Sequence, residues 1–330
     1  MLDVILNKDN LEFLIGGLIA FLLCAIIMPF VIPQLHKFKF GQSIREDGPK
    51  SHLAKQGTPT MGGVVFVIVA IITMFVYKPS YALSGDGLAI TAVFFCFFLI
   101  GFVDDALIII RKKNDGLSPK LKLLLQILVT LSLIVIYPDL FFSPEYTTVS
   151  FLGFGVNLHL FYILFALIMF VGYSNATNLT DGLDGLSSIT VAIALFFMCV
   201  IAMAQQQSTV AMYCAILIGA LLGFYLYNKR PAKIFMGDTG SLALGGFYAI
   251  VALLLKVEIL SLIIGLLFVI ETISVVMQVL YYKKTKKRIF RMAPIHHHFE
   301  AGPLKEAGTV RLFYVLSLIF GLIGMVIYFV

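Results

Sequence analysis

The stretch AVFFCFFLIGFVDD, residues 92–105, joins a long apolar run to two adjacent carboxylates. No charged residue occurs between positions 88 and 103, and a helix that crosses the hydrocarbon core of a bilayer needs roughly 20 mostly apolar residues. Two acids at a membrane boundary are costly unless they are hydrated, paired with basic groups or bound to a cation. The stretch therefore predicts a membrane helix that ends at Asp104 and Asp105.

The same apolar character extends over the whole chain. Of its 330 residues, 60% are hydrophobic and 13% are charged, whereas soluble domains have roughly 45–50% and about 25%. This composition excludes a secreted enzyme, a disordered protein and a nucleic-acid-binding module, and the long unbroken apolar runs exclude a transmembrane β-barrel. The net charge of +6 does not indicate a nucleic-acid partner, because in a membrane protein the placement of basic residues matters more than their sum.

Apolar windows predict an all-α integral membrane protein with about ten transmembrane helices. The windows cover residues 11–32, 62–77, 88–104, 121–137, 159–176, 187–204, 209–227, 242–257, 259–280 and 311–330. An even number of crossings places both termini on the same side. The first segment follows a tail with one lysine and two aspartates, which fits an uncleaved anchor better than a signal peptide. We expect a single polytopic domain over residues 1–330.

Basic residues predict the orientation of these helices. The loops after the first, third, seventh and ninth segments contain 21 of the 24 lysines and arginines, and loops rich in these residues face the cytoplasm. Lys8, Lys78 and Lys256 lie on the other side, so both termini are predicted to be extracytoplasmic. The longest outer connection, residues 138–158, contains alternating stretches and glycines, which favours a small β-hairpin.

Acidic residues and histidines collect on the predicted cytoplasmic face. We expect an active site built from the loops at residues 33–61, 104–120, 175–188, 228–241 and 281–310. Adjacent carboxylates such as Asp104 and Asp105 suit a hard cation such as Mg²⁺, or they raise the pKa of one partner so that it acts as a base. A solvated helix end is the alternative.

A second acidic stretch is NATNLTDGLDG, residues 175–185. It offers Asn178, Asp181 and Asp184 in a turn that leads into a helix, and glycines allow a ligand to approach the backbone closely. The stretch has no basic residue, which favours contacts with a metal, a ribose or a base over contacts with bare phosphate. An N-capping turn is the alternative.

Two loops combine cations with glycines. In NKRPAKIFMGDTGS, residues 228–241, Asp238 follows three basic residues, which fits either a metal-plus-phosphate site or a basic loop on anionic lipid. In KQGTPTMGG, residues 55–63, Lys55 and Thr60 can offer a charge and a hydroxyl to phosphate. This second string is weak in isolation, and it is not a Walker A loop because its lysine precedes the glycines.

The last predicted cytoplasmic loop contains IHHHFE, residues 295–300. Three consecutive histidines cannot all point to one face of a helix or strand, so a simple three-histidine zinc site is not expected. His296, His297 and His298 can instead donate to phosphate or shuttle protons.

Two polar residues interrupt the ninth segment. Glu271 is expected to have a structural pairing inside the protein, because an intramembrane acid normally faces protein or water. Gln278 lies near the cytoplasmic end and can reach a ligand. The cysteines have no metal-ligand spacing and are expected to be small buried apolar residues; they are Cys24, Cys96, Cys199 and Cys214.

Together these motifs carry a family resemblance. Lys55 with GTPTMGG, the pair Asp104 and Asp105, NLTDGLDGL, NKRPAKIFMGDTGS and APIHHHFE occur in this order on one predicted face. The chain resembles the polyprenyl-phosphate N-acetylhexosamine-1-phosphate transferase superfamily over nearly its whole length. The histidine triplet favours the phospho-N-acetylmuramoyl-pentapeptide-transferase branch over its N-acetylglucosamine relatives. The stretch AGPLKEAGTVR, residues 301–311, departs from that pattern, which has a tryptophan here.

The resemblance implies ten transmembrane helices, a homodimer and a reaction in the bacterial plasma membrane. Phospho-MurNAc-pentapeptide would pass from UDP-MurNAc-pentapeptide to undecaprenyl phosphate, giving lipid I and UMP with Mg²⁺, in the first membrane step of peptidoglycan synthesis. A phosphate's second pKa is near 6, so the acceptor is largely dianionic at neutral pH. Direct attack is therefore favoured over a covalent aspartyl-phosphate intermediate, and both remain open.

The resemblance also implies residue roles. Asp238 would be the principal Mg²⁺ ligand, Asp104 the base or positioner of the lipid phosphate, and Asp105 its support. His297 would be the catalytic member of the histidine triplet. The residues expected to bind substrate are Lys55, Thr60, Asn178, Asp181, Gly182, Leu183, Asp184, Asn228, Phe235, Gln278, His296 and His298.

Within this set, the turn formed by Gly182, Leu183 and Asp184 would lie near uridine, and Phe235 would stack on uracil. Lys55 and Thr60, with the histidines, would hold the phosphates or the sugar-peptide. Two rivals remain: transfer of GlcNAc-1-phosphate within the superfamily, and a secondary transporter, for which ionisable groups near mid-membrane and broken helices in paired halves would be typical.

Overall fold

The computed structural model describes residues 11–37, 55, 57–111 and 115–330. Within these residues, nine helices are long and apolar enough to cross a membrane. They are α2 (Leu11–Lys37), α5 (Gly85–Arg111), α6 (Pro119–Ile136), α9 (Phe161–Thr180), α10 (Leu186–Ala204), α11 (Ser208–Asn228), α12 (Gly237–Leu254), α14 (Leu266–Thr285) and α16 (Lys305–Phe329). A tenth apolar helix, α3 (Gly63–Tyr77), is shorter. The chain is an all-α multi-pass membrane protein.

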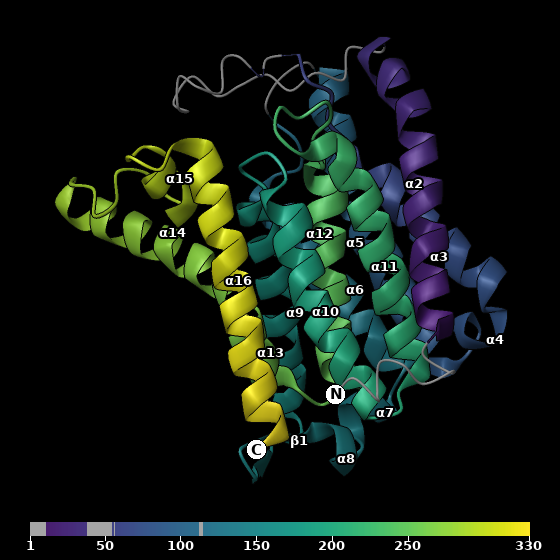
Figure 1. Ribbon diagram of the computed structural model, residues 1–330. Helices are drawn as coiled ribbons and strands as arrows, with labels where there is room; N and C mark the ends of the chain where they lie inside the picture. The colour runs from purple at the N-terminus through teal and green to yellow at the C-terminus, as the bar shows by residue number, and fades with distance from the viewer. Residues whose placement is uncertain (1–10, 38–54, 56, 112–114) are drawn as a thin grey trace.

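The ten predicted segments correspond to these ten helices, but the ninth segment is not one continuous helix. It is divided into α13 (Glu258–Ile264) and α14, with Gly265 between them. Glycine is a poor helix former because it loses the most conformational freedom in a helix. Figure 1 shows α14 diverging from the other long helices, with α15 (Ile295–Glu300) between α14 and α16.

Several helix ends differ from the predicted ones. The helix α5 continues to Arg111, so Asp104 and Asp105 lie inside it, and the prediction that they end the helix is wrong. The five residues that follow the acids, ALIII, are helix-compatible and apolar, and neighbouring helices supply partners for both carboxylates. Asp238 likewise lies in the first helical turn of α12, although the sequence suggested a turn.

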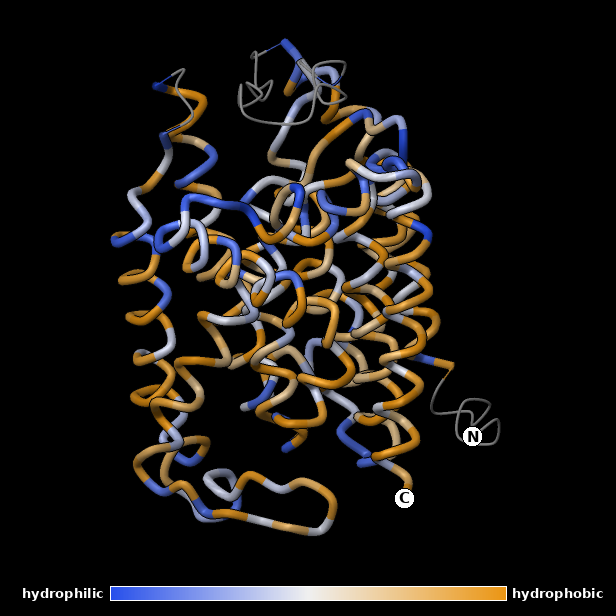
Figure 2. The backbone as a smooth tube through the Cα atoms, turned by 90° about the vertical axis from the view of Figure 1, so that its left-hand side faces the viewer, coloured by the Kyte–Doolittle hydropathy of each residue, from blue (hydrophilic) through white to orange (hydrophobic). Residues whose placement is uncertain are grey.

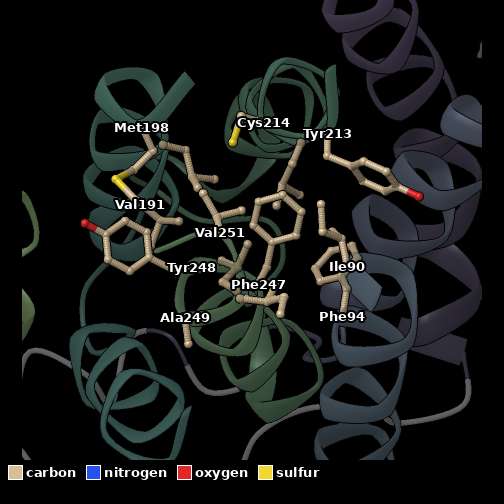
Figure 3. Close-up of a cluster of buried hydrophobic side chains, with 14 of the residues drawn as sticks. Ile90, Phe94, Val191, Met198, Tyr213, Cys214, Phe247, Tyr248, Ala249 and Val251 are labelled. Carbon is tan, nitrogen blue, oxygen red and sulfur yellow. The ribbon is translucent and has the colours of Figure 1, made fainter. Parts of the chain in front are cut away.

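The helix α12 forms the centre of the bundle. All of its residues from Thr239 to Leu254 are buried, and it contacts α3, α5, α9 and α10. Figure 3 shows the ring of Phe247 from α12 among side chains of α5 and α11, and its centroid lies 5.3 Å from that of Phe94. This packing holds the first turn of α12, which carries Asp238, against α5.

The opposite end of the bundle contains the predicted hairpin. Strands β1 (Thr148–Phe151) and β2 (Phe154–Asn157) pair antiparallel, with Thr148 opposite Asn157. Short helices at this end, α4 (Pro79–Ala82), α7 (Asp139–Phe142) and α8 (Pro144–Thr147), were not predicted.

The helix α16 ends on the hairpin side of the bundle, where α2 begins (Figure 1). Hydrophobic residues dominate the middle of the molecule, whereas hydrophilic residues gather mainly toward its two ends (Figure 2). Six of the basic residues used for the orientation lie outside the described residues; they are Lys8, Lys39, Arg45, Lys50, Lys112 and Lys113.

Candidate active site

Three carboxylates from two helices meet at the end of the bundle away from the hairpin. One oxygen each from Asp104, Asp105 and Asp238 lies within 4.8 Å of the others. Asp104 and Asp105 are 4% and 5% exposed, so little water screens their charges. A group of three carboxylates is a ligand set for a hard divalent cation.

Asp105 organises the start of α12. Its Oδ2 accepts hydrogen bonds from the backbone N–H of Thr239 at 2.9 Å and from the Thr239 hydroxyl at 2.6 Å, and Oδ1 accepts from the N–H of Asp238 at 3.3 Å. The first N–H groups of a helix have no partner within the helix, so Asp105 acts as a cap supplied by another helix. Gly237 has φ of +75° and a Cβ there would lie 2.4 Å from Asp105 Oδ2, so this turn requires glycine.

A lysine from α6 lies among the three acids. Lys122 Nζ is 3.2 Å from Asp104 Oδ1 and also donates to Asp238 Oδ2. Because α6 begins at Pro119 with Ser118 as its N-cap, Lys122 is in the first turn of the helix. The sequence indicated Lys122 only as an orienting charge, and the side-chain contact depends on the packing of α6 against α5.

The helix α9 holds the other oxygen of Asp238. Asn178 Nδ2 donates to Asp238 Oδ1 at 2.7 Å and to the hydroxyl of Ser241 at 2.9 Å. Thr177, one residue earlier, donates to the carbonyl of Ser241 at 2.7 Å. Asn178 therefore lies at the acidic cluster and orients the side chain of Asp238. Thr177 and Ser241 help to hold α9 against α12, and the sequence analysis did not single out either residue.

Asp181 directly follows α9, and its carboxyl group is close enough to three other carboxylates to interact with their charges. Burial and the nearby carboxylates of Asp238, Asp105 and Asp184 raise the pKa of Asp181 well above its usual range, while a backbone hydrogen bond from Gly237 opposes the shift. In the absence of a cation the native protein therefore binds the proton of this side chain more tightly than the unfolded chain does.

A second polar cluster lies beside the turn that follows Asp181. Lys55 Nζ is 2.7 Å from Asp184 Oδ1, and the backbone N–H of Ala232 donates to Asp184 Oδ2 at 3.0 Å. Glu306, in the first turn of α16, also pairs with Lys55 and with Arg230. Lys55 and Asp184 are thus brought together as ion-pair partners, and Glu306 is a member of the cluster to which the sequence gave no role.

Backbone hydrogen bonds join the loop after α11 to the loop before α3. The N–H of Phe235 donates to the carbonyl of Pro59 at 2.8 Å, and the N–H of Gly62 donates to the carbonyl of Phe235 at 2.9 Å. Thr60 is buried between them. Asn228 accepts a hydrogen bond from the Ser188 hydroxyl and donates one to the carbonyl of Ile234. Both the oxygen and the nitrogen of its side-chain amide therefore have partners within the protein.

The histidines separate into two groups on α15. The rings of His296 and His297 are 4.1 Å apart and both lie near Gly182, where a Cβ would be 2.3 Å from His296 Nε2. His298 instead accepts from the N–H of Arg291. His297 Nδ1 lies 2.9 Å from Glu300 Oε2.

Glu271 and Gln278 of α14 both have partners within the protein. Glu271 Oε1 lies 3.0 Å from His296 Nδ1, and both side chains are fully buried, so the expected structural pairing of Glu271 is confirmed. Gln278 accepts from the N–H groups of Ile289 and Phe290 and donates to the Phe290 carbonyl. Gln278 therefore fastens the loop after α14.

Leu183 is buried in the turn after α9. Leu183 packs with Leu186, Leu267 and Phe313 in a small apolar cluster. The four cysteines are free thiols. Three of them are buried as expected, and Cys96 is half-buried.

Comparisons with known proteins identify the family of this chain. The model of the family described as Glycosyl transferase family 4 matches residues 87–256, and a Phospho-N-acetylmuramoyl-pentapeptide-transferase signature matches residues 55–67. A phospho-N-acetylmuramoyl-pentapeptide-transferase of Staphylococcus epidermidis is 45% identical over 94% of this chain and 98% of its own length. A protein of the same name from Clostridium kluyveri is 47% identical over 93% and 96%. The chain belongs to the phospho-N-acetylmuramoyl-pentapeptide-transferase family of membrane-embedded transferases.

Proposed function

We propose that this protein transfers phospho-MurNAc-pentapeptide from UDP-MurNAc-pentapeptide to undecaprenyl phosphate, forming lipid I and UMP. The proposal rests on one observation: carboxylate oxygens of Asp104, Asp105 and Asp238 lie within 4.8 Å of one another. The chain that carries them is 45–47% identical to relatives named phospho-N-acetylmuramoyl-pentapeptide-transferase. We also propose that the protein lies in the bacterial plasma membrane as a homodimer, with this site facing the cytoplasm.

The donor set fits Mg²⁺. Asp104, Asp105 and Asp238 offer only carboxylate oxygens, which are the ligands of hard cations, and the ammonium group of Lys122 already lies against two of them. Asp238 is the proposed principal ligand, because its side chain is 23% exposed and can reach a substrate. Bound Mg²⁺ would neutralise the charge that develops on the departing UMP.

The protein's own residues would do the positioning. Phosphoryl transfer needs mainly alignment and charge stabilisation, and the acceptor phosphate is largely dianionic at neutral pH. Asp104 would therefore place the lipid phosphate for direct attack on the β-phosphorus of the nucleotide-sugar, with Asp105 holding the start of α12. His297, which lies near Gly182, would hold the phosphates or move a proton.

The first prediction tests this assignment. Asp238→Asn and Asp104→Asn each remove one negative charge and preserve shape, so we expect lipid I formation to fall by about 100-fold or more, the order seen when a group that stabilises the transition state is removed. UMP release from UDP-MurNAc-pentapeptide in the presence of undecaprenyl phosphate measures it. Asp139→Asn on α7, at the hairpin end, is the matched control.

The same assay separates the alternatives. EDTA should abolish UMP release and Mg²⁺ should restore it. Wild-type turnover in either site variant would exclude the assignment. Preference for UDP-GlcNAc as donor would indicate GlcNAc-1-phosphate transfer, and substrate flux into proteoliposomes without UMP release would indicate a transporter.

A further inference from the structure

Glu306 joins three segments that are distant in sequence. Its Oε1 lies 2.5 Å from Lys55 Nζ, its Oε2 lies 3.4 Å from Arg230 Nε, and Oε1 also accepts from the backbone N–H of Asp184 at 3.4 Å. The Glu306 side chain is only 7% exposed. A buried carboxylate is costly unless it is paired, so these contacts determine where the side chain lies.

An acid in the first turn of a helix often only complements the helix dipole. Such an acid needs no partner outside its own helix and can remain in solvent. The contacts of Glu306 are instead with residues 76 or more positions away in the chain. They bring the start of α16 against Lys55, the turn at Asp184 and the loop after α11.

The charges of this cluster balance. Lys55 and Arg230 supply two positive charges, and Asp184 and Glu306 supply two negative charges. Lys55 is 17% exposed and is shared by both carboxylates, whereas Arg230 is 55% exposed. Loss of the Glu306 charge would leave Lys55 with Asp184 alone, and Arg230 would lose its ion pair with the buried cluster.

The acidic triad is held by other groups. Asp238 and Asp105 are oriented by Lys122, Asn178 and the first N–H groups of α12. Within the described part of the chain, the ion pairs of Glu306 are with Lys55 and Arg230 and do not include the triad. A change at Glu306 should therefore alter substrate binding more than the chemical step.

We infer that Glu306 is a positioning residue of the substrate site, which acts by holding Lys55 against Asp184 and the turn that follows α9. The inference rests on the proposed function and on the substrate-binding roles that the family resemblance implies for Lys55 and Asp184. It gives a role to the stretch at residues 301–311, where the sequence departs from the family pattern.

Steady-state kinetics of four variants test the inference. Glu306→Gln keeps the shape and removes the charge, so we expect KM for UDP-MurNAc-pentapeptide to rise about 10-fold, as for loss of a hydrogen bond to a charged group, with kcat nearly unchanged. Lys55→Met should raise KM at least as much. Because Glu306 acts through Lys55, the double variant should be no worse than Lys55→Met alone.

The fourth variant, Glu258→Gln, is the matched control. Glu258 is also a buried glutamate that pairs with a lysine, Lys256, but it lies at the start of α13. The Glu258→Gln variant should have a lower melting temperature than the wild type and the same KM. Unchanged KM in Glu306→Gln, a fall in kcat alone, or additive effects in the double variant would overturn the inference.

A readout independent of turnover separates the two proposals. The melting temperatures of the same Lys55 and Glu306 variants form a double-mutant cycle, and we expect them to be non-additive. If the wild-type protein fails to use UDP-MurNAc-pentapeptide, the proposed function fails, yet this coupling should remain. If the coupling is absent, Glu306 does not hold Lys55 and the inference fails even in an active enzyme.

Discussion

At the scale of single residues, Lys122 forms ion pairs with two of the three clustered carboxylates, Asp104 and Asp238. Lys122→Met removes the ammonium group that contacts Asp104 and Asp238. The remaining carboxylates repel one another, so we expect the metal-free protein to lose about 1–3 kcal/mol of stability. Mg²⁺ supplies a replacement charge and should raise the melting temperature of this variant more than that of the wild type. Thermal unfolding with EDTA or Mg²⁺ measures both effects.

The matched control is Lys120→Met, in the same first turn of α6 but exposed to solvent. It should behave like the wild type in both conditions. An equal response to Mg²⁺ in the Lys122 variant and the wild type would contradict the role given to Lys122.

Asp181 predicts a pH dependence in the absence of metal. Burial and three neighbouring carboxylates raise the pKa of Asp181. The free energy of unfolding therefore falls as pH rises from the unfolded pKa of about 3.9 toward the raised native pKa, and no such loss occurs below the unfolded value. Asp181→Asn cannot ionise. With EDTA present, we expect the melting temperature of the variant, relative to the wild type, to increase with pH. A constant difference from about pH 4 to pH 8 would contradict the prediction.

At the scale of secondary-structure elements, α12 depends on a cap from α5. Asp105→Ala removes the acceptor of the Asp238 and Thr239 N–H groups, so we expect a loss of about 0.5–2 kcal/mol, the usual effect of losing an N-cap. Asp105→Asn keeps an acceptor oxygen and should lose less. Chemical or thermal unfolding of the two variants checks the order, and equal loss in both would contradict the capping role.

Helix existence was predictable from hydropathy, whereas helix ends and breaks were not. Asp104 and Asp105 look like a helix terminus because carboxylates are costly in a membrane. The structure pairs them with Lys122 and with α12, which removes that cost and lets α5 continue. Gly265 divides the ninth segment, but a lone glycine among apolar residues is too common in membrane helices to predict a break.

At the scale of the whole molecule, the orientation in the membrane can be tested by labelling. Lys233 is exposed in the loop after α11, and Phe154 is 81% exposed in the hairpin at the other end. In intact cells, a membrane-impermeant maleimide should label Phe154→Cys and not Lys233→Cys, because basic loops face the cytoplasm. The reverse pattern would invert the topology. The native cysteines lie within membrane helices and should contribute little background; they are Cys24, Cys96, Cys199 and Cys214.

The sequence by itself determined that the chain crosses the membrane, which segments cross it and at which end the acids gather, because hydropathy and charge are local properties. The family resemblance that its motifs carry also implied related roles for Asp104, Asp105 and Asp238. Only the tertiary structure decided their partners. Lys122 contacts Asp238, 116 residues away in the chain, and Glu306 contacts Lys55, 251 residues away. Such contacts depend on how whole helices pack. Apolar helices carry no local signal of that packing, since lipid and protein neighbours are equally apolar.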